Sequence, residues 1–186
     1  MKLDRETIVK ALGRLGELAH ERGIELHICI YGGSAMILAY DSRLVSKDVD
    51  VIIHPSEEGL ALARQVGEEM GLHSEWLNNE VRYFVSEAKD REGRRPLDLP
   101  IETRGLKLEV PTANYLLAMK ARACREALPG VSIDEADLRF LIRKMGINSI
   151  EQIEAQLERY FPENPLRPGS RTIIQRIIEE VNHERE

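Results

Sequence analysis

A chain of 186 residues fits one domain, or one domain with a helical extension. Its hydrophobic content of 42% and charged content of 31% are typical of a soluble globular protein, and its net charge of −6 argues against a protein that coats nucleic acid. No apolar run reaches the roughly 20 residues that a membrane span needs, and the N-terminus lacks an apolar signal core. We therefore expect no membrane partner and a cytoplasmic protein, with Cys29 and Cys124 as reduced core residues.

The first part of the chain predicts alternating helices and strands. Asp4 can cap a helix that runs to about Arg22, and Gly23 ends it. The elements expected next are a strand over 25–30, a helix over 34–40, a polar loop over 41–47, a strand over 49–53, and a helix capped by Ser56 that ends at Gly71.

The middle predicts strands and the remainder predicts helices. Strands are expected over 81–85, 97–101 and 106–110, with a charged hairpin or loop over 89–96. Pro96 and Pro100 favour an edge or bulged position for the second of these strands. Helices are expected over 111–128 and from Ser132 or Asp134 to Gly146. A third helix is expected after a capping box of Ser149 with Gln152, and a last one over 170–181.

This order predicts an α/β (α+β) protein in two parts. Residues 1–110 would form an α/β core, and residues 111–186 would form a helical C-terminal region packed on that core.

Two aspartates open the strand over 49–53. Asp48 and Asp50 alternate along an extended segment, so both carboxylates are expected on one face. Two like charges there are best explained by a shared divalent cation, since Mg²⁺ prefers carboxylates together with substrate phosphates. The alternative is an edge strand with two solvated acids.

A glycine pair precedes the helix over 34–40. Gly32 and Gly33 allow the backbone to approach a ligand just before a helix N-terminus, where phosphate is favoured. Ser34 could bond a phosphate oxygen or cap the helix. Arg43 and Lys47 could approach a triphosphate, although each alone is typical of a surface charge.

Together these residues resemble a known family. Gly33-Ser34, a spacer of thirteen residues and then Asp48-Val49-Asp50-Val51 resemble the motif of the nucleotidyltransferase (polymerase β-type) superfamily. With PTANYLLAMKARACR downstream, the chain is similar to small prokaryotic proteins related to abortive-infection (AbiE-type) toxin nucleotidyltransferases. The resemblance covers about residues 28–161. It implies a minimal nucleotidyltransferase core with a mixed sheet and a C-terminal helical bundle, Mg²⁺ (or Mn²⁺) at the aspartates, and an NTP as substrate.

The resemblance also implies a third carboxylate on a later strand. Asp98, between Leu97 and Leu99, is the first candidate, and Glu102 is the second. The alternative is that Asp98 is a turn residue. The basic run at Lys89, Arg91, Arg94 and Arg95 is typical of a solvated hairpin tip rather than an RNA site, because no aromatic residues interleave with it.

Two opposite charges fall on the apolar faces of consecutive predicted helices. Lys120 lies on the stripe that includes Leu116, Leu117 and Cys124, and Asp137 lies one turn before Leu141. A buried charge needs a partner or a cleft. The pair is therefore either a structural ion pair or, as the resemblance implies, a cleft wall in which Lys120 meets the NTP phosphates.

The sequence thus leads to two hypotheses. The first is a magnesium-dependent nucleotidyltransferase that modifies RNA (including tRNA) or a protein, as the toxin of a toxin–antitoxin system would. The second is a non-catalytic protein of the same fold that binds a protein partner, such as a cognate antitoxin.

Overall fold

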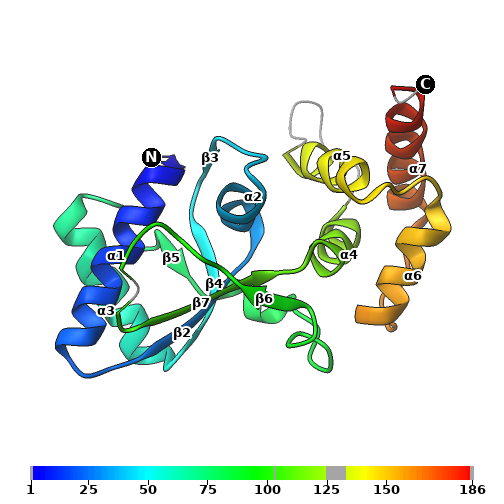
Figure 1. The fold of residues 1–186 in the computed structure, drawn as a ribbon. Helices are drawn as coiled ribbons and strands as arrows, with labels where there is room; N and C mark the ends of the chain where they lie inside the picture. Colours follow the sequence, from blue (N-terminus) through cyan, green and yellow to red (C-terminus); the bar gives the residue numbers. More distant parts are fainter. Residues whose placement is uncertain (1, 103, 125–132, 185–186) are drawn as a thin grey trace. The chain divides into compact units, whose positions relative to one another are not determined.

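The computed structural model describes residues 2–102, 104–124 and 133–184 (Figure 1). The chain divides into two compact units. The first, here called the sheet unit, contains residues 1–84 and 94–111; the second, the helical unit, contains residues 85–93 and 112–186. The predicted α+β class is confirmed. The sequence placed a single boundary after residue 110, whereas the contacts also assign residues 85–93 to the helical unit. No helix in the described ranges is both long enough and apolar enough to cross a membrane.

A mixed five-stranded sheet forms the centre of the sheet unit. β2 (Leu26–Ile30) lies in the middle, with β4 (Val49–His54) antiparallel on one side and β7 (Leu106–Pro111) parallel on the other. β5 (Leu77–Asn78) pairs with β4, and β6 (Arg94–Pro96) pairs with β7. The strand order is therefore β5-β4-β2-β7-β6. Parallel and antiparallel pairs both occur, as the resemblance implied for a mixed sheet.

The two faces of this sheet differ in chemistry. The register pairs Ile28 with Ile53 and with Leu108, and these side chains belong to the main apolar core. That core also contains residues of α1 (Arg5–Glu21) and α3 (Ser56–Met70), which lie side by side in Figure 1. Because side chains alternate along a strand, the opposite face carries Cys29, Asp50, Ile52, Asn78, Glu109, Arg94 and Pro96.

α2 (Gly32–Tyr40) connects β2 to a short ribbon. It begins two residues earlier than predicted, at the glycine pair itself. The segment predicted as a polar loop contains β3 (Val45–Ser46), which pairs with β1 (Leu3–Asp4). Tyr40, the last residue of α2, donates a hydrogen bond of 2.8 Å to the Pro111 carbonyl of β7. Burial raises the pKa of this phenol, so it stays protonated and anchors the end of α2.

The helical unit contains α4 (Ala113–Ala123), α5 (Ile133–Met145), α6 (Ile150–Tyr160) and α7 (Pro168–His183). The predicted capping box at the start of α6 is confirmed. α4 ends at residue 123 rather than 128, because Cys124 takes an extended conformation; residues 125–128 of that prediction lie outside the described ranges.

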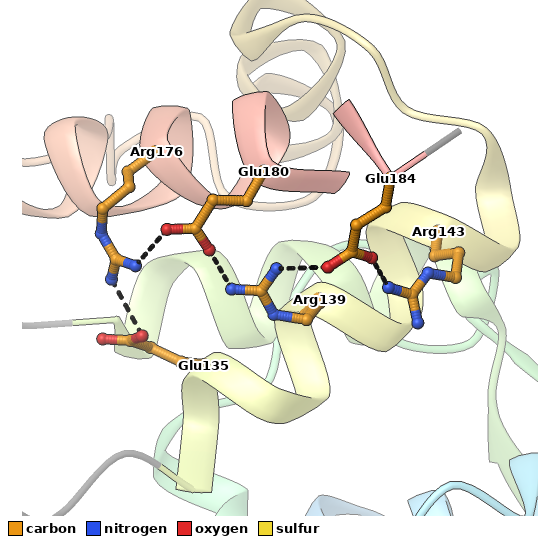
Figure 2. Close-up of polar contacts among 6 residues, drawn as sticks. All are labelled: Glu135, Arg139, Arg143, Arg176, Glu180 and Glu184. Carbon is orange, nitrogen blue, oxygen red and sulfur yellow. Dashed lines mark hydrogen bonds and ion pairs between the residues drawn. The ribbon is translucent and has the colours of Figure 1, made fainter. Parts of the chain in front are cut away.

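A ladder of charges joins α5 to α7 (Figure 2). Arg176 of α7 contacts Glu135 at 2.9 Å and Glu180 at 2.9 Å. Arg139 of α5 contacts Glu180 in turn, and Glu184 accepts contacts from both Arg139 and Arg143. The signs alternate along the ladder, so every like charge is separated from the next by an opposite one.

Three further sequence-based predictions of local structure were wrong. Residues 80–83 form a short 3₁₀ helix, η1 (Glu80–Tyr83), instead of a strand, because only Val81 of the alternating run is buried while Tyr83 and Phe84 are exposed. Residues 97–101 form no strand. One hydrogen bond, from Leu97 N to the Leu108 carbonyl at 3.0 Å, extends past β6, and Pro100 has no N–H with which to continue the ladder. Ser56 is the first residue of α3 and provides no cap hydrogen bond.

Candidate functional site

The Asp50 carboxylate lies against the first residue of α2. A Cβ atom on residue 32 would stand 2.6 Å from Asp50 Oδ2, closer than real Cβ contacts allow. Gly32 also has a φ of +60°, a backbone conformation that residues other than glycine rarely adopt. The backbone of the two segments is joined as well, because Tyr31 N donates to the Asp50 carbonyl at 2.8 Å. Glycine at position 32 is therefore required twice, by conformation and by the approach of Asp50.

Ser34 connects the same helical turn to Asp48. Its Oγ donates a hydrogen bond of 2.7 Å to the Asp48 carbonyl oxygen. Ser34 is fully buried, and it neither caps α2 nor presents its hydroxyl proton to a ligand. Asp48 lies one residue before β4, and its half-buried carboxylate makes no hydrogen bond or ion pair with any described residue. An unpaired, half-buried carboxylate beside Asp50 fits a divalent cation.

Arg43 covers the second glycine. Its guanidinium occupies the place where a Cβ on residue 33 would stand, and Ser46 Oγ lies 2.8 Å from the same point. The first turn of a helix carries unpaired N–H groups and a partial positive charge. Arg43 adds a full positive charge to that turn, so the arrangement favours an anion such as phosphate. Lys47 is exposed, and its carbonyl oxygen lies 3.1 Å from His73 Nε2.

Sequence reasoning missed an acidic residue on the same sheet face. Glu109 of β7 is in register with Cys29 of β2, on the face that carries Asp50. Arg94 Nη1 lies 3.5 Å from the Glu109 carboxylate, and Arg94 Nε donates to the Tyr31 hydroxyl at 3.1 Å. Arg94, which the basic run assigned to a solvated tip, is thus largely enclosed. The alternation of Leu106, Leu108 and Val110 in β7 could have placed Glu109 on this face.

Neither predicted third carboxylate lies on a strand. Asp98 is exposed in the irregular segment after β6, between the buried Leu97 and Leu99. Glu102 is also exposed, and it pairs with Arg104 at 2.6 Å. In the described ranges, no three His, Cys, Asp or Glu side chains gather closely enough to hold a metal by themselves. Protein ligands for a metal would thus come from the Asp48–Asp50 pair, with substrate oxygens completing the set.

The two inward charges of the helical unit contact each other. Lys120 Nζ of α4 lies 2.8 Å from Asp137 Oδ2 of α5, with 11% and 1% of the side chains exposed. This contact is the structural ion pair that the sequence left open as one of two interpretations. The role of Lys120 and Asp137 in catalysis stays a prediction.

Comparisons with models of protein families, with curated proteins and with solved structures found no match to this chain.

Proposed function

We propose that this protein is a magnesium-dependent nucleotidyltransferase that moves a nucleotide from an NTP to an RNA or protein acceptor. The observation that carries the proposal is the close approach of the Asp50 carboxylate to Gly32. A Cβ added to residue 32 would stand 2.6 Å from Asp50 Oδ2. This contact brings a carboxylate to a helix N-terminus that favours phosphate. A metal ion held there would offset the repulsion between the carboxylate and a bound phosphate.

The proposed roles follow from the positions of the side chains. Asp48 and Asp50 would hold Mg²⁺ or Mn²⁺, which supplies charge neutralisation of the triphosphate. The N–H groups of Gly32 and Gly33, with Arg43, would bind and orient the phosphates.

Glu109 is a better candidate for the third acid than Asp98. It lies on a strand of the sheet and on the face of Asp50, whereas Asp98 is exposed in a loop. A carboxylate in this position could accept the proton of the acceptor hydroxyl. Its contact with Arg94 Nη1 at 3.5 Å fixes its direction.

Calorimetric titration with NTP and Mg²⁺ tests the binding site. We expect Asp48→Asn and Asp50→Asn each to weaken metal-dependent NTP binding more than ~10-fold, while Asp98→Asn leaves it unchanged. Glu109→Gln should retain NTP binding and lose transfer. Equal affinity in the wild type and the Asp48→Asn/Asp50→Asn double variant would refute the site.

The acceptor is identified by the destination of the label. The protein would be incubated with each radiolabelled NTP and cell lysate, with Asp50→Asn as the inactive control. Label in RNA would support the toxin-type reaction on RNA, and label in protein would assign a protein acceptor.

The second candidate is a non-catalytic protein of this fold that binds a protein partner such as an antitoxin. The observation in its favour is that, among the described residues, no three potential metal ligands converge. A stable complex with a partner and no label transfer under any NTP would support it over the first candidate.

A further inference from the structure

A hollow of about 300 Å³ opens beside β5, at the edge of the five-stranded sheet. Its walls come from α3, from the turn before β5, from β5 and from η1, all within the sheet unit. We call it the β5 pocket and define it by Arg64, Asn78, Asn79, Arg82 and Tyr83. None of these residues belongs to the site described above.

The pocket is connected to that site through the sheet. Asn78 is the Cα partner of Asp50 in the parallel pairing of β5 with β4. Neighbouring strands are about 4.8 Å apart, and residues in register point to the same face. A ligand that contacts the Asn78 side chain is therefore one strand away from the candidate metal-binding carboxylate.

The lining suits a planar, neutral group with hydrogen-bonding edges. The guanidiniums of Arg64 and Arg82 are balanced by the carboxylates of Glu75 and Glu80, so the pocket has no excess of positive charge for a phosphate. Asn78 is 8% exposed, and its Oδ1 accepts from Glu80 N at 3.0 Å. Its Nδ2 has no hydrogen-bond partner among the described residues and can donate to a ligand.

An aromatic ring forms the outer wall. Tyr83 is 68% exposed, so its ring is accessible to a ligand. Arg82 lies 4.6 Å from the centre of the ring, and its Nη2 also donates to the Tyr83 hydroxyl. Arg82 therefore covers one face of the ring, and nucleobases stack on guanidinium planes as well as on aromatic rings.

We propose that the β5 pocket binds one nucleobase with its ribose, stacked on Tyr83 and hydrogen-bonded to Asn78. This inference deepens the proposed function, and it rests on that function in naming a nucleoside rather than another planar group. The nucleoside could belong to the NTP or to the end of an RNA acceptor, because both present the same ring and sugar.

The first test uses nucleosides alone, without phosphate or metal, so that it does not depend on Asp48 or Asp50. Each of the four ribonucleosides is titrated into the ¹⁵N-labelled protein, and the amide signals of residues 74–84 and the Asn side-chain amides are followed. We expect shifts confined to the pocket for at least one nucleoside, with a Kd of about 0.1–1 mM. No shift at 10-fold higher concentration, about 10 mM, would overturn the proposal.

Two variants test where the ring binds. Tyr83→Ala should weaken binding about 10-fold or more through the loss of stacking. Phe84→Ala is the matched control, since Phe84 is 59% exposed in the same turn but does not line the pocket. Equal losses in the two variants would show nonspecific aromatic contact and would refute the pocket.

Two ligands distinguish the source of the nucleoside. If the NTP fills the pocket, Tyr83→Ala weakens NTP binding with Mg²⁺; if an acceptor fills it, the variant weakens binding of a single-stranded 8-nucleotide RNA instead. Absence of nucleoside binding in the wild type, together with NTP binding that still depends on Asp50, would reject this inference alone. Intact nucleoside binding with no effect of Asp48→Asn or Asp50→Asn on NTP binding would reject the proposed function alone.

Discussion

Replacing Gly32 with alanine would place a methyl group on the Asp50 carboxylate. The added Cβ would stand 2.6 Å from Asp50 Oδ2, whereas ordinary contacts of this kind begin at 3.4 Å. The carboxylate or the start of α2 must therefore move by about 1 Å. The backbone adds a second cost, because a φ of +60° is strained for alanine.

The chain provides a control that separates the two costs. Gly23 has a φ of +67°, and nothing lies within 4 Å of its added Cβ. Gly23→Ala therefore carries the backbone strain alone, about 1 kcal/mol after the gain from a stiffer unfolded chain. Gly32→Ala adds an overpacking cost of about 1–3 kcal/mol, so we expect a total loss of about 2–4 kcal/mol.

Urea unfolding of both variants measures the difference. The double variant Gly32→Ala/Asp50→Ala removes the overlapping carboxylate, so its loss should be smaller than the sum of the two single losses by about 1–3 kcal/mol. Displacement of a catalytic group by about 1 Å costs about 100-fold in rate, so the proposed nucleotide transfer should fall by about that factor in Gly32→Ala. Equal losses of stability in Gly32→Ala and Gly23→Ala would refute the close approach of Asp50.

Two further predictions concern the helical unit. Lys120→Met removes the cation that Asp137 contacts, so the free energy of unfolding, measured in urea, should fall by about 3–5 kcal/mol. Lys120→Met/Asp137→Leu should recover most of that loss. A double variant no more stable than the single one would contradict the ion pair. Contacts from Arg139 and Arg176 lower the pKa of Glu180 below its ordinary 4.5, so its contribution is complete above pH 4.5 and is lost as the pH falls through the lower folded-state value. The stability difference between the wild type and Glu180→Gln should therefore shrink in acid, and a difference that stays constant from pH 7 to about pH 3 would contradict this linkage.

The regular elements of the chain could be predicted because their signals are local. Asp4 caps α1 through Thr7 N at 2.8 Å, and the reciprocal contacts of Ser149 and Gln152 begin α6, as the sequence indicated. The errors occur where contacts between distant segments determine the local structure. β5 contains only two residues, and no periodicity can reveal a strand of that length.

The candidate site shows the same division between local and distant information. Gly32, Asp48 and Asp50 were found because one strand–helix–strand segment contains them. The alternation within β7 could have placed Glu109 on the face away from the core. Only the pairing of β7 with β2, strands that are about 80 residues apart in the chain, brings it near the strand of Asp50. The Asp98 prediction relied on flanking leucines, which are buried in an irregular segment as readily as in a strand.

Residues 85–93 belong to the helical unit, although the segments before and after them belong to the sheet unit. This assignment affects which fragments keep their contacts and how the chain folds during synthesis. Ser86 N donates to the Tyr115 hydroxyl at 2.7 Å, and that hydroxyl contacts Asp90 at 3.1 Å. A fragment that begins at Thr112 would lose both contacts and expose the ring that packs on Tyr160 and Phe161. During synthesis, residues 85–93 leave the ribosome before their partners exist, so the helical unit completes its fold only after its last helices have emerged.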